Sequence, residues 1–178
     1  MSRPLLFFGA LVFLCIALLV AHSLFLKANS KNTMRIESEA FGHGGQIPAQ
    51  FTCDGENVSP SFSFSGVPKE ARSLVLIMDD PDAPSGLWVH WLVWNISVVT
   101  KTIGEGGVPA KATEGMTSFG ATSYGGPCPP DGEHRYFFKL YALDTELELP
   151  KETTKDRLEE AMTGHVLDKA ELIGLYSR

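Results

Sequence analysis

The sequence predicts a mostly β domain that has one short helix near its C-terminus and is preceded by an N-terminal membrane-spanning helix. Three apolar runs of strand length, residues 74–78, 91–96 and 136–143, are rich in aromatic and β-branched side chains, which favours strands over helices. Glycine and proline separate these runs, most densely over residues 125–132, as is typical of turns. A fourth apolar segment, which begins at residue 4, is far longer than any of the three and predicts the membrane helix.

Residues 1–26 form the predicted membrane segment. After Arg3, residues 4–26 contain no charged side chain, and at about 1.5 Å per residue they are long enough to cross the roughly 30 Å core of a bilayer. A secretory signal peptide usually has a shorter apolar stretch of about 7–15 residues, although Ala21-His22-Ser23 resembles a cleavage site. We therefore predict an uncleaved single-pass anchor. A cleaved signal is the alternative, and a buried core helix is a third interpretation, for which the segment shows no polar face.

Two signals disagree about the side of the membrane on which the domain lies. Lys27, Lys31 and Arg35 follow the apolar segment, and the positive-inside bias, applied literally, places the domain in the cytoplasm. The order of a short basic start, an apolar run and a polar spacer is that of an export signal. We predict a membrane-anchored domain outside the cytoplasm, for example in a periplasm, or a secreted domain if the signal is cleaved.

The rest of the chain is interpreted as a polar tether, residues 27–34, and one domain, residues 35–178. The tether is rich in Asn, Ser and Lys, and a length of 178 residues leaves room for a single domain. Phe62 and Phe64 alternate with serines, as in a half-buried strand, and residues 172–176 predict a last strand. Together with the three longer runs, this pattern predicts mostly antiparallel β structure.

One short helix is predicted after the last of the long apolar runs. Residues 153–156, Thr-Thr-Lys-Asp, resemble a capping box. Leu158, Ala161 and Met162 form an apolar stripe at helical spacing, and Gly164 is a typical stop.

Composition and motifs exclude several classes of function. The formal net charge is −6, and no cluster of Lys and Arg is present to neutralise phosphates along a duplex, so no nucleic-acid partner is expected. The sequence contains no His-Glu-x-x-His and no close pairing of Cys with His, so no metal or other cofactor is predicted. It also lacks the Gly-x-Ser-x-Gly of many serine hydrolases.

The cysteines leave two interpretations open. Cys15 lies within the apolar segment, which leaves Cys53 and Cys128 as a pair in the domain. In an oxidising compartment these two could form one disulfide, whereas in a reducing one they would be two free buried thiols.

Three polar clusters lie in loops or at the starts of strands. Asp79-Asp80-Pro81-Asp82-Ala83-Pro84 follows a buried run, and its prolines stiffen the chain where carboxylates project. Trp88 and His90 are two residues apart and share one face of an extended chain. Residues 125–130, Gly-Gly-Pro-Cys-Pro-Pro, precede His134-Arg135-Tyr136, whose first and last side chains point the same way. Taken singly, the clusters also fit a solvated turn, a core histidine bonded to a carbonyl, and a proline-rich hairpin loop.

Together these clusters resemble the phosphatidylethanolamine-binding protein (PEBP) family, in particular the bacterial branch known as YbhB/YbcL or Raf kinase inhibitor-like proteins. The resemblance is carried by Asp-Pro-Asp-Ala-Pro at 80–84, the Trp88 and His90 pair, and the glycine- and proline-rich run that ends in His134-Arg135-Tyr136. Residues 51–60 and 138–143 also resemble that branch. The similarity covers about Arg35 to Tyr176 and leaves out the membrane segment.

The resemblance implies an antiparallel β-sandwich with a small pocket that binds phosphate-type anions. Carried over residue by residue, the ligand-binding positions are Asp80, Asp82, Pro84, Trp88, His90, Gly126, His134 and Tyr136. The resemblance also implies a cis peptide bond between Ala83 and Pro84.

Each expected role follows from donor and acceptor chemistry. His90 and His134 are expected to donate to phosphate oxygens, as are the hydroxyl of Tyr136 and the backbone N–H of Gly126. The carboxylates of the 80–82 segment would repel a phosphate, so they are expected to hold the histidines or to accept from the ammonium of a head group. Trp88 is expected to supply an apolar wall or a face for a cation.

The leading interpretation is therefore a non-enzymatic binding protein. Its expected ligand is a phosphorylated small molecule, a lipid head group or a phosphorylated side chain, and it could thereby inhibit or regulate a kinase or a protease. The membrane is an expected partner through residues 1–26. The alternatives are a hydrolase or metal-dependent enzyme that uses the Asp and His residues of the pocket, and a structural subunit with a vestigial pocket.

Overall fold

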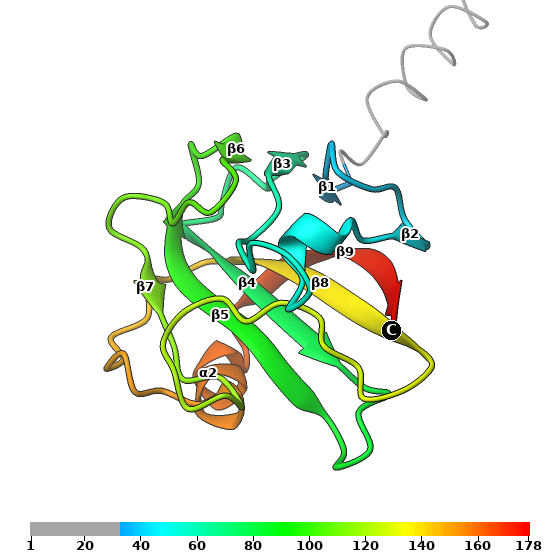
Figure 1. Ribbon diagram of the computed structural model, residues 1–178. Coiled ribbons are helices and arrows are strands. Elements are labelled where there is room, and N and C mark those ends of the chain that lie inside the picture. The colour runs from blue at the N-terminus through cyan, green and yellow to red at the C-terminus, as the bar shows by residue number, and fades with distance from the viewer. Residues whose placement is uncertain (1–32) are drawn as a thin grey trace, which may run out of the picture. The chain divides into compact units, whose positions relative to one another are not determined.

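The computed structural model describes residues 33–178 (Figure 1). The predicted membrane segment and most of the predicted tether lie outside the described residues. Within residues 33–178, no helix is both long and apolar enough to cross a membrane. The elements are β1 (Arg35–Glu37), β2 (Gly45–Gln46), the 3-10 helix η1 (Ala49–Phe51), β3 (Phe62–Ser65), β4 (Ser73–Asp80), β5 (Trp88–Ser97), β6 (Thr102–Ile103), β7 (Thr113–Glu114), β8 (Glu133–Leu143), α2 (Lys155–Met162) and β9 (Val166–Ser177).

The strands form two sheets. The larger has six strands in the order β2-β9-β8-β4-β5-β7, and the smaller has three in the order β1-β3-β6. Within the described residues every pair is antiparallel except β2 with β9, which is parallel. The prediction of a mostly β domain with mostly antiparallel pairing is confirmed, and the short edge pair of β2 with β9 is the exception.

Strand β4 lies at the centre because it is apolar on both faces. Every one of its side chains is buried, as expected for a continuous apolar run that is covered from both sides. Leu74, Leu76 and Met78 belong to one core cluster, while Val75 and Ile77 belong to another. This alternation follows from the two-residue period of a strand.

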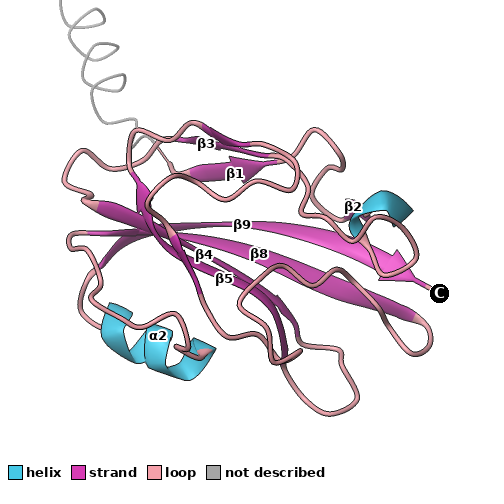
Figure 2. Cartoon of the chain, turned by 60° about the vertical axis from the view of Figure 1, so that its left-hand side comes forward, coloured by secondary structure: helices cyan, strands magenta, loops and turns pink. Residues whose placement is uncertain are grey.

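The three-stranded sheet covers one face of the six-stranded sheet (Figure 2). Ile36 of β1, Phe62 of β3 and Ile103 of β6 are in the same core cluster as the first face of β4. The ring of Phe62 lies 5.0 Å from that of Phe138 in β8, measured between centroids. The two sheets therefore form a sandwich around one apolar core.

Helix α2 covers the opposite face of the large sheet (Figure 2). Leu158 and Met162 are its buried residues, and Gly164 follows its end with a φ of +83°, so the predicted apolar stripe and stop are confirmed. The capping box is wrong in detail, because Thr154 is the N-cap and its side chain makes no capping hydrogen bond.

The sheet brings the three polar clusters to one end. Asp80 at the end of β4 is paired in register with Trp88 at the start of β5. On the other side of β4, Asp79 is paired with Phe137 near the start of β8. Segments that are far apart in sequence therefore meet where β4 ends.

Candidate ligand-binding pocket

A pocket of about 410 Å³ opens at this end of the sheet. Its lining combines residues from all three clusters with two others, Ser85 and Phe119. The lining residues are Asp80, Ala83, Pro84, Ser85, Trp88, His90, Phe119, Cys128, Pro129, Pro130, His134 and Tyr136. Six of the eight residues expected from the resemblance are among them, and Asp82 and Gly126 are not.

His134 and Asp80 form a buried pair on the pocket wall. Nδ1 of His134 lies 2.7 Å from Oδ2 of Asp80, and the two side chains are 8% and 4% exposed. Because a carboxylate accepts and cannot donate, Nδ1 carries the proton of this hydrogen bond. Nε2 is then the nitrogen that remains for a ligand, and the carboxylate can balance a positive charge on the ring.

His90 is oriented differently, by a backbone carbonyl. Its Nδ1 donates to the oxygen of Gly125 at 2.6 Å, and the residue is 3% exposed. Burial lowers the pKa of His90 below its usual value of 6.5, partly opposed by the hydrogen bond to Gly125 and by the charge of Asp80. At neutral pH the ring is therefore uncharged, and Nε2 is an acceptor instead of the donor that the sequence analysis expected.

Tyr136 lies between the two histidines. Its ring centroid is 5.2 Å from that of His90 and 6.5 Å from that of His134. The hydroxyl makes no hydrogen bond of ordinary geometry within residues 33–178, although the carboxylate of Asp80 and the backbone of Cys128 lie close enough to affect its pKa. Burial, and to a smaller extent the charge of Asp80, raise the pKa of Tyr136, so the hydroxyl keeps its proton. A protonated hydroxyl on the pocket wall can donate to a polar group bound there.

Asp82 does not line the pocket and instead forms hydrogen bonds with Arg135. Nε and Nη2 of Arg135 donate to its two carboxylate oxygens at 2.8 and 2.6 Å, and the Arg135 backbone N–H donates to it at 3.0 Å. The side-chain hydrogen bond from Arg135 lowers the pKa of Asp82 to about 2. This pair ties the 80–86 loop to the start of β8, next to His134.

Gly126 does not line the pocket, and its N–H is engaged within the protein. Its N–H donates to Oδ1 of Asn57 at 2.8 Å, so it is not available to a ligand. A Cβ at this position would lie 2.5 Å from the Phe51 carbonyl oxygen, so the glycine serves close contact between two loops.

The Ala83–Pro84 peptide bond is trans, because no cis bond occurs in the described residues, and the expectation of a cis bond is wrong. The N–H of Gly86 donates to the oxygen of Ala83 at 2.9 Å, which closes a turn with Pro84 at its second position. A trans proline suits that position, whereas the cis isomer is used one residue later in a turn.

Phe119 is a pocket residue that sequence reasoning missed. It lies in an irregular stretch between β7 and β8, and it is 47% exposed. Its ring contacts those of Trp88 and His90 edge-on, at 5.5 and 5.3 Å between centroids. No pattern around it marks a site, since a single exposed aromatic residue in a loop is common.

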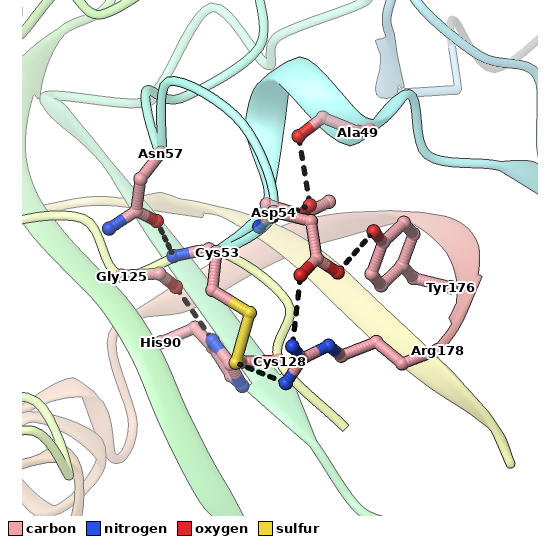
Figure 3. Close-up of a disulfide and its surroundings, with 11 residues drawn as sticks. Ala49, Cys53, Asp54, Asn57, His90, Gly125, Cys128, Tyr176 and Arg178 are labelled. Carbon is pink, nitrogen blue, oxygen red and sulfur yellow. Dashed lines mark hydrogen bonds and ion pairs between the residues drawn. A yellow bond between two sulfur atoms is a disulfide. The ribbon is translucent and has the colours of Figure 1, made fainter. Parts of the chain in front are cut away.

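A disulfide joins Cys53 and Cys128, with 5.4 Å between their Cα atoms (Figure 3). The structure therefore decides between the two interpretations of these cysteines. The N–H of Cys53 also donates to the oxygen of Pro127 at 3.0 Å. Together with the bond from Gly126 to Asn57, these links fix the loop that carries the carbonyl of Gly125 and hence orients His90 (Figure 3).

Within residues 33–178, no group of three or more His, Cys, Asp or Glu side chains is arranged to hold a metal ion. The pocket residues fit hydrogen bonding to a polar group, surrounded by apolar walls.

Comparison with known proteins identifies the family. A family model described as phosphatidylethanolamine-binding protein matches residues 37–177. The chain belongs to the phosphatidylethanolamine-binding protein family. The resemblance drawn from the loop motifs, and its extent, are thus confirmed.

Relatives of this PEBP domain come from distant organisms. A UPF0098 protein of Methanothermobacter thermautotrophicus is 51% identical over 150 residues, which are 82% of this chain and 99% of that protein. A UPF0098 protein of Chlamydia trachomatis is 46% identical over the same shares of the two chains.

Two solved structures show the same fold. A PEBP homolog from Chlamydia trachomatis, CT736, superposes with a TM-score of 0.80 at 46% identity and covers 83% of this chain and 99% of its own. Escherichia coli YbcL, described as a new member of the mammalian PEBP family, has a TM-score of 0.77 at 29% identity and covers 82% and 98%.

Proposed function

We propose that this PEBP-family protein is a binding protein whose pocket captures the phosphate group of a phosphorylated small molecule, a lipid head group or a phosphorylated side chain. The observation that carries the proposal is the buried hydroxyl of Tyr136, which makes no ordinary hydrogen bond within residues 33–178 and whose ring lies beside both histidines. Nδ1 of each histidine is already bonded within the protein, which leaves both Nε2 atoms for a ligand.

Charge balance favours a singly charged phosphate ester. The lining includes no Lys or Arg, and it includes the carboxylate of Asp80. A protonated His134 would donate to one phosphate oxygen and Tyr136 to another, while neutral His90 would accept from a protonated oxygen. Since the second ionisation of a phosphate ester has a pKa of about 6, this arrangement predicts tighter binding below pH 6 than above it.

Alanine substitution of each histidine tests the proposal. Phosphoethanolamine titrated into the purified protein by calorimetry should bind, and His90→Ala and His134→Ala should each weaken binding by roughly ten- to a hundredfold, since hydrogen bonds to charged groups are worth about 1.5–3 kcal/mol. Unchanged affinity in both variants would rule out this pocket as the phosphate site.

A hydrolase is the second candidate, and one observation favours it. The bond from Nδ1 of His134 to a buried carboxylate orients Nε2 as in a general base, and Ser85 lines the same pocket. Turnover of p-nitrophenyl esters or phosphates that is lost in His134→Ala would favour this function. Stoichiometric binding without turnover favours the binding protein.

We also propose that the domain works outside the cytoplasm, held at a membrane by residues 1–26. The disulfide supports an oxidising compartment. Resistance of the protein to carbonate extraction from membranes, together with protection of Cys53 and Cys128 from alkylation in intact cells, would support this proposal. Alkylation of both cysteines without reductant would contradict it. The idea that the protein regulates a kinase or a protease stays a prediction, tested by capture of phosphorylated partners.

A further inference from the structure

We propose that Phe119 and Trp88 form a second subsite beside the polar part of the pocket, and that it selects phosphate monoesters whose alcohol part is flat and apolar. This inference rests on the proposed function, because it concerns the part of the ligand next to the phosphate. It assigns a specificity-determining role to Phe119.

The ring of Phe119 is exposed and yet held in place. Almost half of the residue, 47%, faces solvent, although the ring contacts Trp88 at an interplanar angle of 79° and His90 at 73°. Edge-to-face contacts of this kind fix the orientation of a ring, and here they leave nearly half of the residue exposed. The exposed area therefore belongs to an aromatic side chain that is already ordered.

Backbone contacts hold the loop that carries this ring. The N–H of Ser118 donates to the oxygen of Val89 at 3.0 Å, and the N–H of Val89 donates to Oγ of Ser118 at 2.9 Å. Thr117 donates to the oxygen of Ala121 through both its N–H and its hydroxyl, each at 2.9 Å. The chain on either side of Phe119 is thus tied to β5 and closed on itself, so little ordering is left for a ligand to impose.

Gly125 provides the surface against which the ring lies. A Cβ at Gly125 would meet the carbons of the Phe119 ring well inside van der Waals contact. The same residue supplies the carbonyl that orients His90. The polar and apolar parts of the pocket are therefore positioned by one short segment.

The remaining lining explains why an apolar group should occupy this space. Apart from Asp80, Ser85, the two histidines and the hydroxyl of Tyr136, the walls are apolar, and Pro84, Pro129 and Pro130 continue the surface from the aromatic residues. Inorganic phosphate would fill only the polar part and leave these walls in water. A flat group attached to the phosphate would cover the Phe119 ring, and aromatic contacts of that kind are worth about three- to tenfold in affinity beyond the area they bury.

The test compares inorganic phosphate, methyl phosphate, phenyl phosphate and butyl phosphate by calorimetry with the purified protein. Phenyl phosphate should bind about tenfold more tightly than methyl phosphate, and butyl phosphate should lie between them. In Phe119→Ala the ratio of phenyl to methyl affinity should fall to about two or less. Because a ratio within one variant is measured, a general loss of affinity does not obscure the result.

Two further variants sharpen the comparison. Phe119→Leu keeps an apolar side chain but removes the flat face, so it should lose most of the preference for phenyl over butyl phosphate. Val99→Ala removes an apolar side chain that is 77% exposed and does not line the pocket, so its ratios should equal those of the unmodified protein.

The measured affinities distinguish failure of the second subsite from failure of the phosphate site. Equal affinity for methyl and phenyl phosphate, or a phenyl preference that survives both changes at Phe119, overturns the second subsite and leaves the phosphate site standing. Butyl phosphate bound as tightly as phenyl phosphate overturns the requirement for a flat group and favours a lipid-like chain. Failure of all four compounds to bind refutes the proposed function itself.

Discussion

Nδ1 of His134 lies 2.7 Å from Oδ2 of Asp80, and both side chains are almost entirely buried. The second oxygen of Asp80 accepts the N–H of Asp82 at 2.8 Å, so the carboxylate is held from two sides. This arrangement places a fixed negative charge behind the imidazole of His134, on the side opposite its free nitrogen. It fixes the direction in which that nitrogen faces a bound group.

Asp80→Asn should weaken phosphate binding. The amide oxygen can still accept from Nδ1 of His134, but the charge that balances an imidazolium is lost, so we expect roughly tenfold weaker binding of phosphoethanolamine at pH 6. Asp131→Asn is the matched control, because it removes an exposed carboxylate that does not line the pocket. Tighter binding to Asp80→Asn would mean that repulsion from the carboxylate dominates.

The low pKa of His90 predicts that stability falls on acidification. Burial lowers the folded-state pKa below 6.5, so the unfolded chain takes up the proton first as the pH falls. Above about pH 6.5 the neutral His90 therefore contributes fully to the free energy of unfolding. Below that pH the free energy of unfolding falls by up to about 1.4 kcal/mol per pH unit. Urea unfolding at pH 7.5 and 5.5 should show a larger drop for the unmodified protein than for His90→Gln. Equal drops would contradict the assignment.

Loss of the disulfide should destabilise the domain. Cys53 and Cys128 are 75 residues apart in sequence, and a cross-link that closes a loop of this length is worth about 4 kcal/mol in the chain-entropy account. The double variant Cys53→Ser, Cys128→Ser should lose about that much free energy of unfolding. Dithiothreitol should lower the stability of the unmodified protein and leave the double variant unchanged; a reductant that changes neither would show that the bond is absent in solution.

A buried ion pair near the end of β4 should contribute more to stability than ion pairs on the surface. Asp79 is fully buried, and Nζ of Lys139 donates to its two oxygens at 2.7 and 2.8 Å, while Nζ of Lys155 lies 3.9 Å away. Lys139→Met should lower the free energy of unfolding by about 3 kcal/mol. This is the low end of the range for a buried charge that loses its partner, because Lys155 still lies near Asp79. Arg157→Met breaks only an exposed pair with Glu160 and should change stability by less than about 0.5 kcal/mol. Urea unfolding of the two variants measures the difference, and similar losses of stability in Lys139→Met and Arg157→Met would contradict this account.

Some of the fold could be predicted because burial leaves a pattern in the sequence. The runs 74–78, 91–96 and 136–143 fall within β4, β5 and β8, which lie side by side in the large sheet. Strand β9 was predicted only from residue 172, because its first half alternates charged and partly exposed side chains and lacks an apolar run. The strands of two or three residues are too short to show any period.

Some residues of the site could likewise be predicted from the sequence, and others could not. Asp80, His90 and His134 could be placed together because each lies at the end or start of a strand, within a motif of the family. The role of Gly126 could not be foreseen, since Asn57 takes its N–H from 69 residues away in sequence. Phe119 lies in a loop without any pattern, so its contacts with Trp88 and His90 emerge only from the fold.

Tyr136→Phe tests the central claim most directly, because it removes one buried oxygen and nothing else. The hydroxyl makes no hydrogen bond of ordinary geometry within residues 33–178, so its loss should change the free energy of unfolding by less than about 1 kcal/mol. If the hydroxyl donates to a bound phosphate, the same change should weaken binding of phosphoethanolamine by about tenfold or more. Calorimetry and urea unfolding of the one variant measure both quantities. Weaker binding with nearly unchanged stability is the result that this account predicts, and unchanged affinity would contradict it.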